Sequence, residues 1–149
     1  MKVKLTMAAL AIACLAAAGC GGSASSSTKA AGAAGNPCQA LSAWRSSGGM
    51  AEMNAITSDL ATIETAASAQ SMTALASAGQ ALDNDTQNAA LDLPPIDTID
   101  YTNAMADFQT AGTDFAAGTQ SSAAAGETPL KTAAQEFQSF AASVKASCN

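Results

Sequence analysis

Residues 50–69 read MAEMNAITSDLATIETAASA and carry the clearest structural signal in the chain. Their large apolar residues recur in alternating steps of three and four, at Met53, Ile56, Leu60 and Ile63. Such steps place the residues on one face of an α-helix, which predicts a helix that packs on a partner through this face. Asp59 and Glu64 fall outside the face and are expected to contact water.

The next stretch repeats the pattern and predicts a second helix over residues 72–90. Its seam positions are Met72, Leu75, Gly79, Leu82, Thr86 and Ala89. Gly79 and Ala89 are small, so a neighbouring helix can approach closely there. Ser71 is a candidate N-cap, since its hydroxyl can accept from a free backbone N–H. Pro94 and Pro95 end the helix because proline cannot continue the hydrogen-bond ladder.

Two more helices are expected downstream. The first begins after an Asp97 or Thr98 cap, and its seam residues are Tyr101, Met105, Phe108, Gly112 and Phe115. Residues 118–126 are expected to form a loop. Thr128 and Pro129 are then expected to begin the last helix, because proline fits the first helical turn. That helix carries Leu130, Phe137 and Val144 at steps of seven.

A short helix is expected ahead of these four, starting at Asn36 and Pro37, running to about Ser46 and broken at Gly48 and Gly49. Each longer segment has about twenty residues, roughly 30 Å of helix. Alanine favours helix, and residues that favour strands are scarce. Residues 37–149 are therefore predicted to form an all-α domain, an up-down-up-down four-helix bundle with a short extra helix at one end.

The N-terminus has the parts of a secretory signal. Lys2 and Lys4 precede an apolar run over residues 5–15, and small residues follow. The run is shorter than the ~20 residues of a membrane-spanning helix. Residues 1–19 are therefore predicted to be a signal peptide. Residues 21–35 contain glycine, serine, threonine, alanine and one lysine, and are predicted to be a flexible tether with roughly 20 Å of reach.

The signal ends in Leu15-Ala16-Ala17-Ala18-Gly19-Cys20, which resembles a bacterial lipobox. The resemblance implies that Cys20 is lipidated and becomes the first residue of the mature chain. Residues 20–36 would then be a lipidated tether on the extracytoplasmic face of the cell membrane. The alanine-rich composition is similar to that of actinobacterial lipoproteins. The family usually has leucine where this chain has Ala17, and the alternative is ordinary cleavage with Cys20 as an incidental residue.

The remaining cysteines bracket the predicted bundle. Cys14 leaves with the signal and Cys20 is the predicted lipid site, so Cys38 and Cys148 remain as an even pair. In an exported protein such a pair is expected to be a disulfide. Closing a loop of this size contributes at most about 4–5 kcal/mol in the chain-entropy account. A redox-active or metal-binding pair is the alternative, although such thiols usually lie close in sequence.

The sequence contains no histidine, which excludes Ser-His-Asp and Cys-His catalytic groups and the Glu-x-x-His motif of diiron bundles. Asp100, Asp107 and Asp114 recur every seven residues and are expected to form a solvated face, with cation binding as the alternative.

Two further features carry weaker signals. Asp83-Asn84-Asp85 partly matches a calcium loop but lacks its later glycine and glutamate. Trp44, the sole tryptophan, is expected to fill the core or a bundle end rather than a ligand pocket. We therefore predict no catalytic, cofactor-binding or metal-binding residues.

Charge restricts the partners of the mature chain. Four basic residues (Lys29, Arg45, Lys131, Lys145) against twelve acidic ones give a net charge of −8. An acidic surface repels nucleic acid and anionic lipid headgroups, so membrane contact is expected through the lipid anchor alone. The predicted role is a non-enzymatic interaction or accessory module of the cell envelope, with an envelope protein as partner. The alternative is a carrier that holds a small apolar ligand between its helices.

Overall fold

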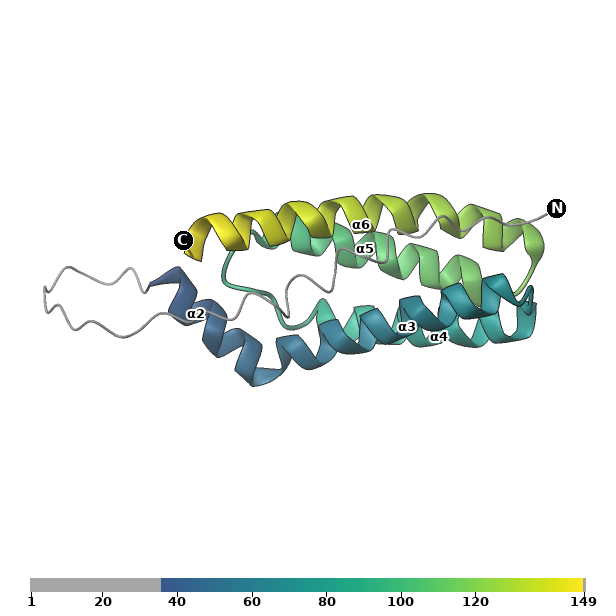
Figure 1. Cartoon of the computed structure of the whole chain (residues 1–149), viewed down its shortest axis with the longest axis horizontal. Coiled ribbons are helices and arrows are strands. Elements are labelled where there is room, and N and C mark those ends of the chain that lie inside the picture. The colour runs from purple at the N-terminus through teal and green to yellow at the C-terminus, as the bar shows by residue number, and fades with distance from the viewer. Residues whose placement is uncertain (1–35, 149) are drawn as a thin grey trace, which may run out of the picture.

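The computed structural model describes residues 36–148, and within this range the chain forms only helices and turns. The elements in order are α2 (Pro37–Trp44), the π-helical turn η1 (Arg45–Gly49), α3 (Met50–Ser68), α4 (Met72–Ala89), α5 (Thr98–Ala116) and α6 (Gln120–Cys148). Figure 1 shows the four long helices side by side, with α2 at one end. The predicted all-α helical bundle with a short extra helix is confirmed.

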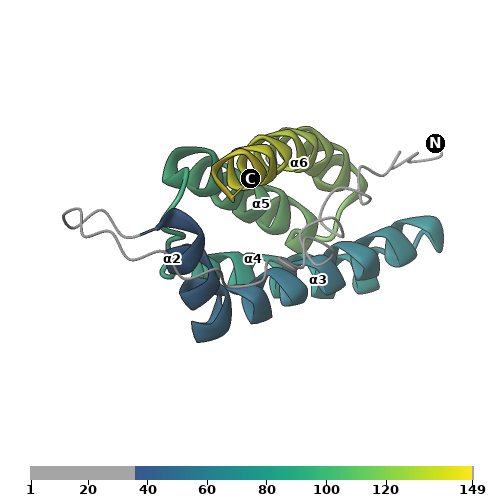
Figure 2. The ribbon, with the colours of Figure 1, turned by 60° about the vertical axis from the view of Figure 1, so that its left-hand side comes forward.

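Packing follows the order of the chain. α3 packs on α4, α4 on α5 and α5 on α6, each pair joined by a short connection. α2 contacts α6 near the C-terminus of α6, so the short first helix and the last helix meet at one end of the bundle. Figure 2 shows α2 and the end of α6 at this same end from a second direction. We call it the disulfide end, because Cys38 of α2 and Cys148 of α6 are bonded there.

Cap residues set several helix boundaries where the sequence predicts them. The side chain of Asn36 accepts from the backbone N–H of Cys38 at 3.1 Å, with Pro37 at the first helical position. Ser71 Oγ accepts from the N–H of Ala74 at 3.3 Å, and Asp97 Oδ1 accepts from that of Asp100 at 3.4 Å. Each bond satisfies an N–H that the helix itself leaves free, which fixes where the helix begins.

The predicted break between the first two helices is a kink at Gly48. Its φ of 148° lies outside the region that residues with a Cβ readily adopt. The chain therefore changes direction between α2 and α3 without a long loop. This change lets α2 cross the end of the bundle instead of continuing along α3.

The predicted start of the last helix at Thr128 and Pro129 is wrong, as is the loop predicted over residues 118–126. α6 begins at Gln120, has 29 residues and contains Pro129 in its interior. Thr119 and Ser122 cap the helix reciprocally: Thr119 Oγ1 accepts from the N–H of Ser122, and Ser122 Oγ accepts from that of Thr119, both at 3.1 Å. This paired cap competes successfully with the proline as the point of helix initiation.

The extension of α6 has a packing cause. Its buried residues continue the three-and-four spacing on the N-terminal side of Pro129, through Ala123 and Gly126. Gly126 lies under the ring of Phe115, where an added Cβ would come within 2.8 Å of Cε1. The segment 120–128 therefore contributes to the core, and burial against α5 offsets the cost of a proline in a helix interior.

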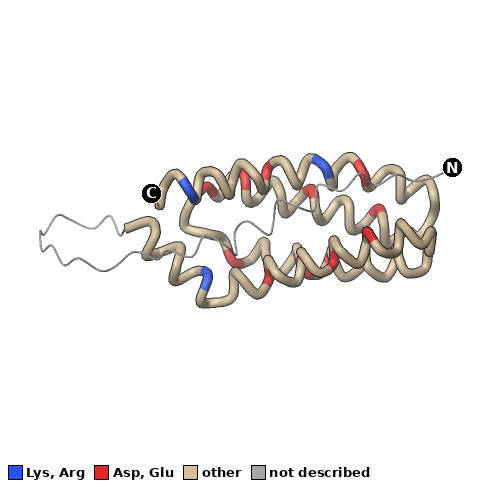
Figure 3. Tube along the Cα trace, in the orientation of Figure 1, with Lys and Arg blue, Asp and Glu red and all other residues tan. Residues whose placement is uncertain are grey.

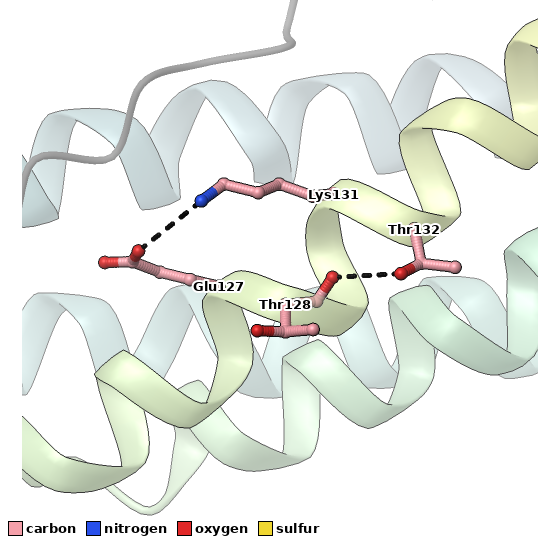
Figure 4. A network of polar contacts seen from close by, with 4 residues as sticks. All are labelled: Glu127, Thr128, Lys131 and Thr132. Carbon is pink, nitrogen blue, oxygen red and sulfur yellow. Dashed lines mark hydrogen bonds and ion pairs between the residues drawn. The ribbon is translucent and has the colours of Figure 1, made fainter.

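Two interactions span Pro129 on the surface of α6, as Figure 4 shows. Lys131 Nζ lies 3.8 Å from Glu127 Oε2, and Thr132 Oγ1 donates to the carbonyl oxygen of Thr128 at 3.2 Å. An ion pair between residues four apart on an exposed helix contributes about 0.2–0.5 kcal/mol. Both interactions lie across the turn in which Pro129 provides no N–H.

The core is built from a few large side chains among many alanines. The aromatic residues buried to within 2% exposure are Tyr101, Phe108, Phe115, Phe137 and Phe140. Met53, Ile56, Leu60 and Ile63 of the first predicted seam are all buried, as are Leu75 and Leu82 of α4. The predicted seams on α3, α4 and α5 are therefore the faces that pack.

Candidate interaction site

Cys38 and Cys148 form the predicted disulfide. Their sulfur atoms lie 2.09 Å apart and their Cα atoms 5.3 Å apart. The bond joins the first turn of α2 to the last residue of α6, across 110 positions of sequence. Cys20, the signal peptide and tether residues 20–35 lie outside the described residues, so the lipidation prediction stays a prediction.

Trp44 and Tyr101 organise the connection between α4 and α5 at the disulfide end. Trp44 Nε1 donates to the carbonyl oxygen of Asp92 at 2.9 Å, and the Tyr101 hydroxyl donates to that of Ala89 at 3.0 Å. The two rings meet edge to face with their centroids 5.9 Å apart. These bonds tie the carbonyl of Ala89, at the end of α4, and that of Asp92, in the connection, to side chains from α5 and α2. The prediction that Trp44 fills a bundle end is confirmed.

A surface pocket of about 460 Å³ lies beside this connection, between the N-terminal half of α3 and the C-terminal end of α4. We call it the acidic groove. Its polar lining consists of Glu52, Asp85, Asp92 and Asn88. Ala51, Ala55 and Leu91 supply its apolar lining. The groove therefore combines carboxylates with methyl-bearing walls in one open site.

The carboxylates of the groove act on one another. The pKa of Glu52 is raised, first by burial and then by the negative charges of Asp92 and Asp85. Oε2 of Glu52 is buried and has no hydrogen-bond partner within the described part of the chain. A buried polar atom without a partner costs stability.

The connection that follows α4 and the first turn of α5 also expose large aliphatic side chains. Leu91, Leu93 and Ile99 are 86%, 50% and 71% exposed. Residues 36–148 contain only twelve leucine, isoleucine and valine residues. These three are a quarter of them, and all three lie within nine positions of sequence. A single exposed leucine is ordinary, but Leu91 is both exposed and part of the lining of the groove.

Asp59 does not face open water as its position off the seam predicted. One of its oxygens, Oδ2, is buried, and the side chain lies against Asp85 of α4. Burial, a hydrogen bond with the Asp85 carboxyl and the charge of Asp85 together raise the pKa of Asp59 to about 6. Two ionised carboxylates can only accept hydrogen bonds, so this contact becomes a bond when a proton lies between them.

The Asp100, Asp107 and Asp114 series is half-buried rather than the solvated face that was predicted. Across from it on α6, the pKa of Glu136 is raised by burial, by the charges of Asp107 and Asp100, and by a hydrogen bond with Asp107. The seven-residue spacing placed these carboxyls together correctly, but they lie beside a neighbouring helix.

The remaining metal candidates are not supported within residues 36–148. Asp83, Asn84 and Asp85 lie inside α4, so they form no calcium-binding loop. In this range no group of three histidine, cysteine, aspartate or glutamate residues is arranged to hold a metal ion. Over the same residues, no helix combines the length and the apolar character needed to cross a membrane.

Sequence reasoning did not find the acidic groove. Its residues come from three separate places, around Glu52, around Asp85 and around Leu91, and only the packing of α3 on α4 brings them together. The available signal was the sequence Leu91-Asp92-Leu93, where two large aliphatic residues stand in a turn that ends at proline. No family model, curated protein or solved structure matches the chain.

Proposed function

We propose that this chain is a membrane-anchored extracytoplasmic lipoprotein whose helical domain is a non-enzymatic interaction module of the cell envelope. The Cys38–Cys148 disulfide is the observation that carries the proposal, because such bonds persist outside the reducing cytoplasm. It agrees with the basic, apolar and small-residue order of residues 1–19 and with the lipobox-like Leu15-Ala16-Ala17-Ala18-Gly19-Cys20.

The interaction role is supported by the surface at the disulfide end. Exposed Leu91 and Leu93 lie on the connection that borders the acidic groove, and exposed Ile99 lies in the first turn of α5, whereas the aromatic side chains fill the space between the helices. We favour an interaction module over the carrier hypothesis for this reason. The absence of histidine from the sequence removes the usual base of nucleophilic catalysis and agrees with a non-enzymatic role.

The test of anchoring is the intact mass of the protein extracted from bacterial membranes. The expected mass is that of residues 20–149 plus acyl groups, with a gain of two hydrogens on reduction. Cys20→Ala should abolish acylation and the cleavage before residue 20, so that the variant keeps residues 1–19. Cys14→Ala is the matched control and should leave both properties unchanged. An unacylated wild-type protein, or an acylated Cys20→Ala protein, would contradict the proposal.

A further inference from the structure

We propose that the acidic groove docks a basic segment of a partner protein. An aliphatic side chain of that segment packs against Leu91, and a lysine or arginine enters between Glu52, Asp85 and Asp92. This inference rests on the proposed function and adds to it the chemistry of the partner.

Leu91 provides the apolar part of the site. It lines the groove and is 86% exposed, so nearly its whole side chain is available to a partner. Burying a leucine side chain contributes about 1.5–3 kcal/mol. Trp44 holds the adjacent backbone by donating to the carbonyl oxygen of Asp92, which keeps this wall of the groove in place before a partner binds. A pre-positioned surface loses less entropy on binding.

The carboxylates select the charge of the partner. Glu52, Asp85 and Asp92 line the same groove, and the negative charges of Asp92 and Asp85 add to burial in raising the pKa of Glu52. A lysine or arginine in the groove would supply the opposite charge to these carboxylates. Figure 3 shows acidic residues on all four long helices and few basic ones. Residues 36–148 hold twelve acidic residues and three basic ones, so the surrounding field also attracts cations.

The mixed lining distinguishes a protein segment from other occupants. Lysine and arginine carry an apolar stem below the charge, which suits a site with Ala51 and Ala55 beside the carboxylates. A bare metal ion would gain nothing from Leu91 or the alanines. Nucleic acid and anionic lipid carry the same sign of charge as the groove.

Trp44 gives a direct readout of occupancy. It is the sole tryptophan, and its indole N–H is bonded to a residue that lines the groove. The experiment titrates a tryptophan-free helical peptide of lysine and leucine into the full chain carrying Cys20→Ala, which carries no acyl group. Fluorescence and calorimetry are recorded on the same samples. The expected result is saturable binding, with no binding of a peptide in which glutamate replaces lysine.

Matched variants locate the contact. Asp85→Asn combined with Glu52→Gln should weaken binding at least about tenfold, since each charged contact contributes appreciably in a partly buried site. Leu91→Ser should weaken it by about tenfold, as loss of a leucine contact predicts. Glu64→Gln makes the same kind of charge change on exposed α3 surface outside the groove and should leave affinity within about twofold. Circular dichroism checks that each variant is folded.

The possible outcomes are distinct. Equal affinity of all variants, or no binding by either method, would overturn the docking proposal. A fluorescence response to vesicles of phosphatidylcholine and phosphatidylglycerol but not to the peptide would also overturn it and assign the surface to the membrane. None of these results changes the intact mass of the wild-type protein, so failure here is separable from failure of the proposed anchoring.

Discussion

Gly79 of α4 and Gly112 of α5 face each other so closely that neither has room for a methyl group. A Cβ added to Gly79 would lie 2.7 Å from the carbonyl oxygen of Gly112, and one added to Gly112 would lie 2.9 Å from that of Gly79. The obstructing atoms belong to the backbone and cannot rotate away. α4 and α5 therefore pack with their main chains in contact at this point.

Gly79→Ala is expected to destabilise the protein by about 1–3 kcal/mol, because the helices must separate to admit the methyl group. In a helix with free space at this position, the same change would stabilise the protein by about 1 kcal/mol. The sign of the change in unfolding free energy therefore reports whether α4 and α5 are in contact here. Urea denaturation followed by circular dichroism measures the difference. Ser77→Ala, at an exposed position of the same helix, should be neutral or slightly stabilising. A stabilised Gly79→Ala protein would show that α4 and α5 lie further apart.

Pro129→Ala tests the continuity of α6. Within a helix interior, alanine should restore the missing hydrogen bond and stabilise the protein by about 1–3 kcal/mol. If the helix instead began at Pro129, the same substitution would remove a favourable first-turn residue and would not stabilise. The measurement is again the free energy of unfolding. Gln135→Ala, exposed on the same helix, controls for the general effect of adding alanine and should change stability by only a few tenths of a kcal/mol.

Stability is expected to rise as the solution is acidified from neutral pH. The pKa values of Glu52, Asp59 and Glu136 are all raised in the folded protein, by burial first and by neighbouring acids next. A raised carboxyl pKa means that the folded state binds protons more readily than the unfolded state. Stability therefore increases as pH falls through the folded value, which is about 6 for Asp59, towards its ordinary value of 3.8.

Thermal unfolding across this pH range measures the effect, and Asp59→Asn should reduce it by removing the carboxyl that shares a contact with Asp85. Glu64→Gln removes an exposed carboxyl from the same helix and should leave the pH dependence as it is. A melting temperature that falls steadily from pH 7 to pH 5 would contradict this prediction. It would show that folding does not raise the pKa values of these carboxyls.

Loss of the disulfide should cost up to about 4–5 kcal/mol, because the bond closes a loop of more than a hundred residues. Cys38→Ala combined with Cys148→Ala should therefore unfold at lower urea concentration, as should the wild type under reductant. Reductant should have no effect on the double variant, which serves as the control. Identical unfolding of oxidised and reduced wild type would contradict the expected contribution of the bond.

Much of the fold follows from local patterns in the sequence. The spacing of Met53, Ile56, Leu60 and Ile63 was sufficient because each large residue stands among alanines and polar residues, so the buried face is unambiguous. Ser71 and Asp97 marked helix starts because their caps depend only on nearby backbone. The disulfide followed from the number and position of the cysteines. In each case the deciding interaction is local or is fixed by composition.

Predictions were wrong where tertiary packing outweighed a local preference. Pro129 is a good helix starter, but burial of Ala123 and Gly126 against α5 extends α6 beyond it. Asp59 was placed correctly on its helix, but the carboxyl that it meets comes from α4. The acidic groove was not predicted because it exists only where two helices and a connection converge. The sequence alone does not show that α3 and the end of α4 are neighbours, and the groove lies between them.

The Cys38–Cys148 bond makes almost the whole described domain a covalent ring. A single cut by an extracellular protease anywhere between these cysteines would open the ring without dividing the molecule into two pieces. The exposed connection around Leu91 and Leu93 is the kind of site that proteases reach first. A cut there would leave α2–α4 and α5–α6 joined through sulfur, so that the nicked halves can re-associate as one molecule.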